Sequence, residues 1–411
     1  MPEITLMRRK IFTLLTALLF IAQTLPAQKA SSTSEDSLIN SLSKTPTTIG
    51  GYGNAFYQRN ANQGASKLDL ERFVIFIGHK FNDKISVFSE LEVEDAKVTG
   101  GEPGGEVAIE QAYLKFNLSA NQYIVAGLFI PRLGILNENH LPNTFNGNER
   151  NSVETVIIPS TWRELGVGLY GNFNNFPANY SIALVNGLNS ASFQHGTGIR
   201  EGRFEGRNAT GNNLALTAAL QFYLGNIKAQ LSGYYGGTVG ISKHRADSLG
   251  LNSGAFGTPV AIGEGDVQYA AGGFSFKILG TVVSTPDAEN INKAYASNTP
   301  KIEYGVYAEA AYDVLHSVKK SHEQQFIVFV RDERLNINAR IPSNGVPDGT
   351  LNQNFLVAGF SYLPTRNVAV KADISVIQTG NQKTNLINQI PAAQSFQTSN
   401  NLVSLGIAFS F

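Results

Sequence analysis

The chain has 411 residues, with 32 basic and 32 acidic side chains, 40 Gly, 25 Phe, 15 Tyr and no cysteine. The even charge balance argues against a nucleic-acid partner, which requires a basic excess or stripe, and the absence of cysteine excludes both a lipoprotein anchor and a disulfide framework. Only 16% of the residues are charged, and with so many Gly and aromatic residues this composition favours many strands with aromatic girdles over a helical domain.

The first segment, residues 1–27, is typical of a secretory signal peptide. Arg8, Arg9 and Lys10 precede an apolar run at residues 11–22, and residues 25–27 offer a small-residue cleavage site. The run is about twelve residues long, too short for a membrane-spanning helix, which needs about 20. Cleavage would remove three basic residues and one acidic residue, leaving a formal charge of about −2. A soluble secreted protein is the alternative that the signal leaves open.

Residues 28–48 are rich in Ser, Thr and Lys, which predicts a periplasmic spacer or one short helix rather than a domain. From residue 49 to residue 411, apolar residues alternate with small or polar ones between clusters of Asn, Gly, Asp and Pro. This is the pattern of many short strands joined by turns. A large barrel is one domain whatever its length, so residues 49–411 are predicted to form a single barrel domain.

The alternation at residues 84–94 decides which side of the barrel faces water. One face carries Ile85, Val87, Leu91 and Val93, and the other carries Lys84, Ser86, Glu90, Glu92 and Glu94. Successive side chains of a strand point to opposite faces, and a charge facing lipid costs about 2–4 kcal/mol at mid-depth. The carboxylates must therefore face water inside the barrel, with the apolar residues outside. We predict an all-β fold, a transmembrane antiparallel β-barrel.

Alternation of this kind, clear or weak, predicts about sixteen strands. They are expected at residues 51–57, 70–81, 84–94, 107–118, 123–130, 163–170, 180–186, 214–224, 227–232, 267–276, 278–283, 302–312, 326–331, 355–363, 368–377 and 401–411. Tight turns are expected at Asn226 and at residues 364–367. At residues 107–118 the parity conflicts, since Val107 and Ile109 are odd whereas Leu114 is even, which predicts a bulge or a misplaced boundary.

The segment at residues 401–411 has the strongest outward-apolar pattern. Its alternate residues are Val403, Leu405, Ile407, Phe409 and Phe411, separated by Ser404, Gly406, Ala408 and Ser410. A terminal Phe on such a strand resembles the assembly signal of bacterial outer-membrane barrels. Phe409 and Phe411 are therefore predicted to be read by the barrel-assembly machinery, and the bacterial outer membrane is the predicted location.

Residues 131–161 show no sustained alternation. The charged or titratable residues of this segment, all candidates for a pore constriction, are Arg132, Glu138, His140, Glu149, Arg150 and Glu154. Unstructured segments of this length are uncommon and are usually functional or disordered. In a wide barrel, a loop folded inward would narrow the lumen and set the electrostatic barrier for solutes. An external loop over the mouth is the alternative.

Several segments resemble the phosphate-selective porin O and P family. The residues concerned are 127–134, Glu149-Arg150 and 163–169, with similar stretches at 110–114 and 68–72. The resemblance is sharpest over residues 107–171 and diffuse over residues 49–411. It implies a sixteen-stranded outer-membrane porin with an inward loop, assembled as a homotrimer.

The charges depart from that family, whose anion selection depends on a ladder of Arg and Lys along the pore. The predicted lumen-lining bases are Arg72, Lys84, Lys115, Lys228, Arg331 and Lys371, and the acids are Glu90, Glu92, Glu94, Glu164, Asp266, Glu303, Glu309 and Asp373. Because a narrow passage concentrates the field of its lining charges, this balance predicts weak or mildly cation-favouring selectivity.

The sequence gives little support for a catalytic or metal-binding site. The six His residues are scattered without the spacing of a helical zinc site, so neither a metal nor a cofactor is predicted. His79 has outward parity and leaves open a barrel-wall lipid hydrolase. Trp162 is expected to begin a strand at a membrane interface. Arg200, Arg203 and Arg207 are expected in an external loop, where they could contact lipopolysaccharide.

The sequence therefore predicts a porin, not an enzyme, through which small hydrophilic solutes or ions cross by passive diffusion. Its expected partners are outer-membrane lipid and lipopolysaccharide, the assembly machinery and two further copies of itself. A structural or adhesive barrel with a plugged lumen is the alternative from another class.

Overall fold

The computed structural model describes residues 46–94, 107–318, 323–381 and 398–411. The predicted signal peptide, residues 1–27, and most of the predicted spacer lie outside the described residues. The first strand begins at Thr47, so the last two residues of the predicted spacer, 47 and 48, belong to the barrel wall.

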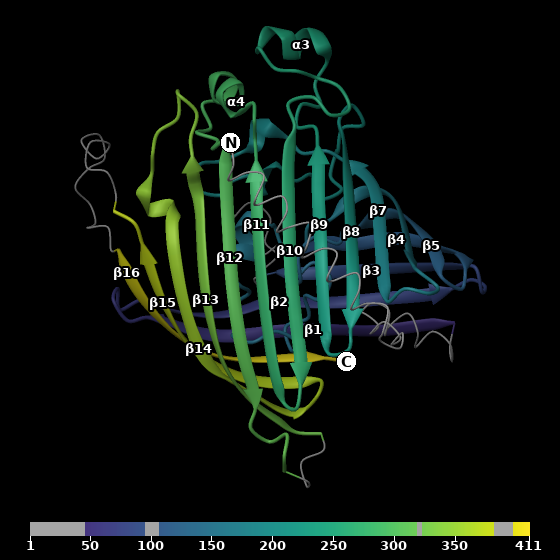
Figure 1. Cartoon of the computed structure of the whole chain (residues 1–411), viewed down its shortest axis with the longest axis vertical. Coiled ribbons are helices and arrows are strands. Elements are labelled where there is room, and N and C mark those ends of the chain that lie inside the picture. The colour runs from purple at the N-terminus through teal and green to yellow at the C-terminus, as the bar shows by residue number, and fades with distance from the viewer. Residues whose placement is uncertain (1–45, 95–106, 319–322, 382–397) are drawn as a thin grey trace, which may run out of the picture.

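Sixteen antiparallel strands form a closed barrel, in which each strand pairs with its neighbours in the chain and β1 pairs with β16 (Figure 1). The strands are β1 (Thr47–Asn60), β2 (Ser66–Lys80), β3 (Ile85–Glu94), β4 (Val107–Ser119), β5 (Gln122–Phe129), β6 (Glu164–Asn172), β7 (Ala178–Asn186), β8 (Leu214–Leu224), β9 (Ile227–Gly236), β10 (Val260–Ala271), β11 (Phe274–Ser284), β12 (Ile302–Asp313), β13 (Gln325–Arg340), β14 (Asn352–Thr365), β15 (Val368–Thr379) and β16 (Ser399–Ser410). The predicted fold class and strand number are confirmed.

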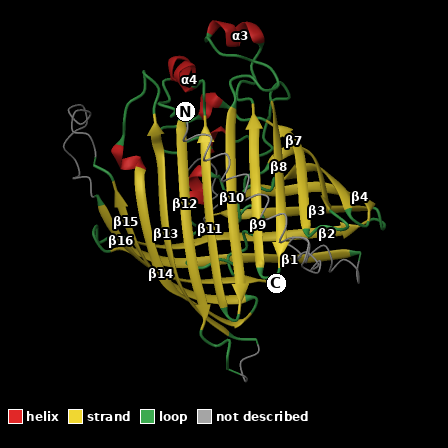
Figure 2. Ribbon diagram, in the orientation of Figure 1, coloured by secondary structure: helices red, strands yellow, loops and turns green. Residues whose placement is uncertain are grey.

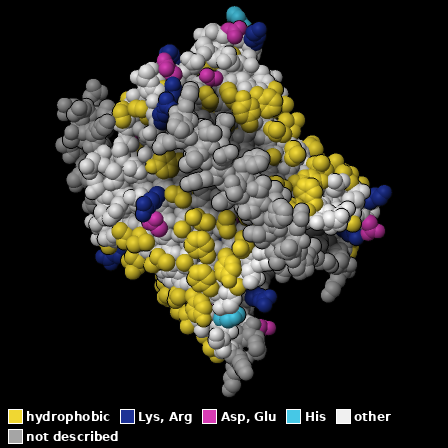
Figure 3. Space-filling model, viewed as in Figure 1, with side chains coloured by type: hydrophobic (Ala, Val, Ile, Leu, Met, Phe, Trp, Pro, Cys, Tyr) yellow, Lys and Arg dark blue, Asp and Glu magenta, His cyan; other side chains and the backbone are white. Residues whose placement is uncertain are grey.

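The outward-apolar parity also holds. In β16, the outward residues Leu405 and Ile407 are 56% and 52% exposed, whereas the inward residue Ser404 is 2% exposed. Figure 3 shows hydrophobic side chains spread over the flank of the barrel, with many of the visible charged side chains toward its ends. One exception is on β13, where Asp332 and Arg334 face outward and pair at 3.1 Å.

The two ends of the barrel differ in their connections. Short turns join the strands at one end, and longer loops carry two short helices, α3 (Lys243–Ser248) and α4 (Ala288–Tyr295), at the other (Figure 2). The other helical turns in the described part of the chain are a π-helical turn at Val153–Ile157 and 3₁₀ turns at Ser190–Ser192, Arg200–Gly202 and Gly349–Leu351. Within the described ranges, none of the helices has the length and apolar character needed to cross a membrane.

One predicted turn was misplaced. The expected strands at residues 267–276 and 278–283 meet at Lys277, but the structure turns at Gly272 and Gly273, which have φ of +60° and +80°. Two adjacent residues with positive φ are typical of a tight hairpin turn, and Gly adopts them without a steric cost. The Gly-Gly pair was therefore the stronger signal, and β10 and β11 are longer than predicted.

The parity conflict in β4 is explained by a β-bulge. Glu90 of β3 pairs with Gln111, and the next residue, Leu91, pairs with Ile109. Glu110 is the extra residue, and both Glu110 and Gln111 are buried. The bulge thus directs two consecutive polar side chains to the interior, as an extra residue in one strand permits.

The packed core of this barrel lies inside the wall. It joins inward residues of many strands to the segment between β5 and β6. Trp162 belongs to this core, since it is buried, packs against Tyr234 with ring centroids 4.8 Å apart and donates a hydrogen bond to Glu164. The expectation that Trp162 starts a strand at a membrane interface was wrong, because β6 begins two residues later.

Candidate pore constriction

The segment between β5 and β6, residues 130–163, lies inside the barrel and is held from two sides. On the side of β8 and β9, Gln221 and Lys228 donate hydrogen bonds to the Glu138 carboxylate. On the side of β15, Asp373 accepts hydrogen bonds from the backbone and side-chain N–H groups of Asn148 at 2.8 and 2.6 Å. Residues that are distant in the sequence thus fix the loop across the lumen.

Lys371 makes a second anchor on β15. Its buried ammonium donates hydrogen bonds to the carbonyls of Pro142, Phe145 and Gly147, the last two at 2.8 and 2.9 Å. An ammonium has three donors and no acceptor, so three carbonyls satisfy it completely. The loop therefore wraps a wall cation that the sequence predicted only as a lumen-lining charge.

Glu154 organises the loop from within. One carboxylate oxygen accepts hydrogen bonds from the backbone N–H groups of Ile135 and Leu136 at 2.5 and 2.7 Å. The other accepts a hydrogen bond from the Tyr307 hydroxyl at 2.7 Å. Gly134 has φ of +76°, and a Cβ there would lie 2.6 Å from the Glu154 carboxylate. Glu154 was predicted to face the pore, but the structure buries it as the residue that shapes the turn.

Apolar residues anchor the π-helical turn to the wall. Val153, Ile157 and Ile158 are fully buried in the interior core. Gly305 of β12 makes room for them, since a Cβ at this position would lie 2.7 Å from Val153. This part of the loop fills the lumen rather than lining a water path.

A cavity of about 430 Å³ remains beside the loop. It is lined by five bases, Lys67, Arg72, Arg150, Arg200 and Arg203, and by four acids, Asp69, Glu71, Glu94 and Glu149. Its other lining residues are Phe56, Ser152, Thr155, Val156, Ser160 and Thr161. The cavity therefore presents nearly equal numbers of positive and negative side chains to a solute.

The predicted site residues fall into several groups. Those that line the cavity are Arg72, Glu94, Glu149 and Arg150. Those that are buried inside the barrel away from it are Glu90, Glu92, Glu138, His140, Glu154, Glu164, Asp266, Glu303, Glu309, Arg331, Lys371 and Asp373. Arg132 stacks over Tyr170 at 5.1 Å, and Lys115 over Tyr123 at 4.0 Å. Lys84 was wrongly placed in the lumen, because it lies exposed in the turn before β3.

Ion pairs satisfy several of the buried charges. Arg331 pairs with Glu309 at 3.3 Å and with Glu333 at 2.7 Å, and Lys228 pairs with Glu138. Burial tends to raise the pKa of the Glu138 carboxyl, but Lys228 and Arg132, with hydrogen bonds from Lys228 and Gln221, outweigh burial and lower the pKa. These paired groups offer little net charge to a passing ion.

Sequence reasoning missed five of the cavity's charged residues. Lys67, Asp69 and Glu71 belong to the start of β2, whereas Arg200 and Arg203 belong to the loop between β7 and β8. That loop reaches the constriction, as Arg200 donates a hydrogen bond to the Thr155 carbonyl at 3.3 Å. Arg200 and Arg203 are therefore interior residues, not the external charges that were expected. Only the three-residue spacing of Arg200 and Arg203, which stand at the start of the 3₁₀ turn and directly after it, hinted at a shared direction.

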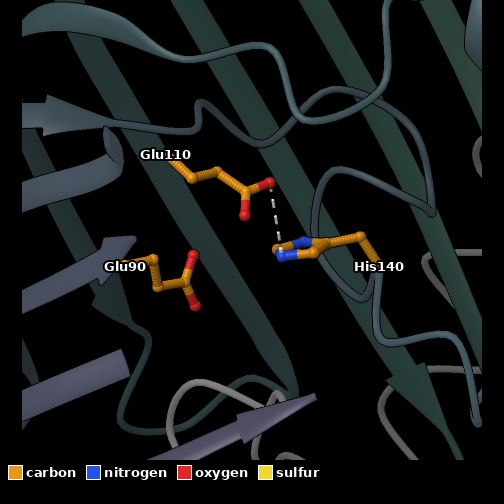
Figure 4. A group of neighbouring side chains, drawn as sticks. All are labelled: Glu90, Glu110 and His140. Carbon is orange, nitrogen blue, oxygen red and sulfur yellow. Dashed lines mark ion pairs between the residues drawn. The ribbon is translucent and has the colours of Figure 1, made fainter. Parts of the chain in front are cut away.

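A second cluster lies at the edge of the constriction. The bulge residue Glu110, Glu90 of β3 and His140 of the loop point toward one another (Figure 4). All three are buried, and His140 Nε2 lies 3.9 Å from a Glu110 oxygen. No His spacing in the sequence indicated this group, because its members come from three separate segments.

His79 faces outward as predicted, and its Nδ1 lies 2.8 Å from the Thr47 hydroxyl. The ring also packs edge-on against Phe81, with centroids 4.9 Å apart. Thr47, rather than a serine, is the hydroxyl that bonds this histidine. These contacts give no geometric support to the barrel-wall hydrolase.

Solved structures of outer-membrane porins and channels share the fold. OmpF of Salmonella typhi, in complex with daunomycin, has a TM-score of 0.55 at 12% identity, covering 89% of this chain and 97% of that one. The outer-membrane channel DcaP of Acinetobacter baumannii has a TM-score of 0.52 at 13% identity, with coverages of 89% and 97%. An anion-selective porin of Comamonas acidovorans has a TM-score of 0.50 at 12% identity, with coverages of 89% and 99%.

The sequence comparisons give a nearer relative. No protein-family model matches the chain. An uncharacterised protein of Aquifex aeolicus (strain VF5) is 32% identical over 344 residues, which are 80% of this chain and 75% of the relative. The chain belongs to the same family as this Aquifex aeolicus protein, and its fold is that of the outer-membrane porins.

Proposed function

We propose that this protein is an outer-membrane porin through which small hydrophilic solutes or ions cross by passive diffusion. The observation that carries the proposal is the inward segment 130–163, held from both sides of the wall beside a charged cavity of about 430 Å³. An apolar exterior and a polar interior suit a barrel in lipid with water inside. No residue needs to perform chemistry, so the proposal is a channel and not an enzyme.

We propose weak selectivity for this channel. Five bases and four acids line the cavity, and the fields of mixed charges within one narrow space largely cancel. Several of the deeper charges form buried ion pairs, among them Arg331 with Glu309 and Glu333, and Lys228 with Glu138. Phosphate selectivity, which the resemblance to the porin O and P family would imply, is the less favoured case. The residues that line the cavity are a mixture of bases and acids and not a continuous row of bases.

Conductance in a planar lipid bilayer tests the function. Purified, folded protein should produce discrete conductance steps, and a salt gradient should give a reversal potential close to zero. A strong chloride or phosphate preference would overturn the weak selectivity while leaving the channel intact. A folded barrel that never conducts would overturn the porin.

The second candidate is a structural or adhesive barrel with a plugged lumen. The apolar packing of Val153, Ile157 and Ile158 against the interior wall favours it, since these side chains fill space that water would otherwise occupy. The conductance measurement separates the two functions. Absence of conductance, with adhesion to a surface, would support the plugged barrel.

Assembly follows from the same proposal. We propose a homotrimer in the bacterial outer membrane, in contact with lipid and lipopolysaccharide and inserted by the barrel-assembly machinery through the β16 signal at Phe409 and Phe411. Chemical cross-linking of protein extracted in mild detergent should give dimers and trimers. Deletion of Phe411 should reduce the amount of barrel in the outer membrane.

A further inference from the structure

The cluster of Glu90, Glu110 and His140 has the composition of a metal site. Each residue offers one donor atom, and the three donor atoms lie within 4.8 Å of one another. The residues are 3%, 0% and 1% exposed. Two acidic side chains this close together and away from bulk water repel each other unless a positive charge lies between them.

His140 supplies the independent observation. Neither ring nitrogen has a hydrogen-bond partner among the described residues, and one oxygen of Glu110 is also without one. Figure 4 shows the imidazole directed at Glu110. Buried polar atoms are nearly always satisfied, so a group is needed that accepts a nitrogen lone pair and a carboxylate oxygen together. A cation does this.

The surrounding residues resemble the outer shell of a metal site. Tyr52 donates a hydrogen bond to Oε2 of Glu110 at 2.9 Å, and Gln111 donates one to Oε2 of Glu90 at 2.9 Å. The Tyr52 ring also packs edge-on against His140, with centroids 5.8 Å apart. Such contacts orient the ligands of a metal ion, and they leave Oε1 of Glu110 directed at His140.

The distances fit an ion after a small contraction. Metal–donor bonds to imidazole and carboxylate are about 2.0–2.2 Å, so in a tetrahedral site two donors on one ion lie about 3.3–3.6 Å apart. His140 Nε2 and Glu110 Oε1 are 3.9 Å apart and would have to approach by a few tenths of an ångström. The third donor, on Glu90, lies within 4.8 Å of the other two and would have to move by about 1 Å, which a change of side-chain rotamer allows.

The donor set selects the kind of metal. One imidazole nitrogen with two carboxylates suits Zn²⁺ and related transition metals, whereas Mg²⁺ and Ca²⁺ favour oxygen ligands alone. Arg72 and Arg150 oppose a cation, but Glu92 adds a third carboxylate, 3.9 Å from Arg72. Arg163 also acts on Glu110, but Arg72 pairs with Glu71 at 2.8 Å and Arg163 with Glu205 at 3.5 Å, so part of the opposing positive charge is already neutralised.

We propose that Glu90, Glu110 and His140 bind one divalent transition-metal ion and so join the inward segment to the wall at β3 and β4. The β-bulge is what makes this possible, because it turns Glu110 inward next to Gln111. Binding itself is independent of the proposed function. The effect of metal binding on the pore does rest on the proposed function, because a metal ion that fixes this loop can reduce fluctuations of the conductance only if the barrel is a channel.

The test measures Zn²⁺ binding to the metal-free, folded barrel in detergent by titration calorimetry. The expected result is one ion per chain, with affinity lowered at least about tenfold in H140A and E110Q. Binding should be unchanged in two controls, H244A, which removes an exposed histidine on α3, and D266N, which alters a buried acid elsewhere in the wall. Equal binding to wild type, H140A and E110Q would overturn the site, as would no binding at all.

Two further measurements keep the outcome clear. Co²⁺ should give visible absorption bands in the wild type that are lost in E110Q, so the site can be judged even if H140A does not fold. In the bilayer, Zn²⁺ should reduce current fluctuations of the wild type but not of E110Q. Zn²⁺ binding without conductance would overturn the porin function and support the metal site. Conductance without Zn²⁺ binding would overturn the metal site and support the porin function.

Discussion

Glu154 is a single residue on which the shape of the constriction depends. Its two carboxylate oxygens together accept four hydrogen bonds, two from backbone N–H groups, one from the Asn151 side-chain amide and one from the Tyr307 hydroxyl. Hydrogen bonds to a charged group contribute about 1.5–3 kcal/mol each. A glutamine at this position would present an amide N–H to donors that already point at it.

We expect E154Q to loosen the inward segment while the barrel remains folded. Limited proteolysis should then cut E154Q within residues 131–161 and leave the wild type uncut there, and single-channel conductance should change. D83N is the control, because Asp83 is an exposed acid in the turn between β2 and β3, outside the inward segment. Equal protection of E154Q and wild type would contradict the role of Glu154.

Glu303 is the opposite case, a buried acid that no described side chain pairs with. It is 1% exposed, and neither of its oxygens has a hydrogen-bond partner among the described residues. A buried charge is costly unless it is paired. Glu309 is equally buried but pairs with Arg331 at 3.3 Å.

These two acids should therefore respond differently to the same substitution. E303Q should leave the thermal unfolding midpoint unchanged or raise it. E309Q should destabilise the barrel by about 1.5–3 kcal/mol, because Arg331 loses one charged partner and keeps Glu333 at 2.7 Å. The midpoint is measured by the heat-dependent shift of the barrel on a gel. A loss of stability in E303Q as large as in E309Q would show that Glu303 has a partner.

At the scale of elements, the inward segment is a bridge with anchors at both ends. Lys371 on β15 holds three of its carbonyls, and K371M would remove all three hydrogen bonds. We expect K371M to free that end of the loop and to raise conductance or its fluctuations. K84M, which alters an exposed lysine in a turn, should behave as the wild type, and a similar change in both variants would argue against the anchor.

The other anchor, Glu138 with Lys228, should respond to pH. The folded-state pKa of Glu138 lies below its ordinary value of 4.5, so the pair stabilises the loop fully above that value. This stabilisation is lost as pH falls through the lowered pKa. Protease sensitivity of the loop should stay constant from pH 7 to 5 and rise only in stronger acid. E138Q should be sensitive at pH 7 already, and a transition near neutral pH in the wild type would contradict this assignment.

At the scale of the whole molecule, the balance of cavity charges decides selectivity. Lys67 and Glu149 both line the cavity near its exposed side. K67Q should shift the reversal potential toward cation preference and E149Q toward anion preference, each by on the order of a few millivolts, because a single charge is screened within about 10 Å at 0.1 M salt. K84Q is the control. Shifts of the same sign in K67Q and E149Q would show that ions do not pass this cavity.

The strands of the barrel wall were predictable from the sequence because the pattern that specifies each strand lies within that strand. Alternation in β16 and in β3 follows from the two faces of a strand, so the parity of Leu405 or Glu92 needs no knowledge of other segments. The bulge in β4 was visible as a change of parity. The turn at Gly272 was missed only because residues of similar polarity continue on both sides of it.

The site was less predictable because it depends on contacts between distant segments. Arg200 meets Thr155 only when two loops fold into the same lumen. The parity of Lys371 placed it inside, but no local pattern could show that loop carbonyls would surround it. Glu110 and His140 come together through a bulge and a loop whose conformations are set by the rest of the barrel.

The seam between β1 and β16 has a consequence for how the protein reaches its native state. The backbones of Gly51 and Phe411 exchange two hydrogen bonds, at 3.0 and 2.8 Å, across nearly the whole length of the chain. Contacts so remote in sequence form slowly, because the chain must first be brought together at an entropic cost. Until then β1 presents an unpaired edge that can join the strands of another molecule. The interval between synthesis of β1 and its pairing with β16 is therefore the period in which this edge is open to aggregation.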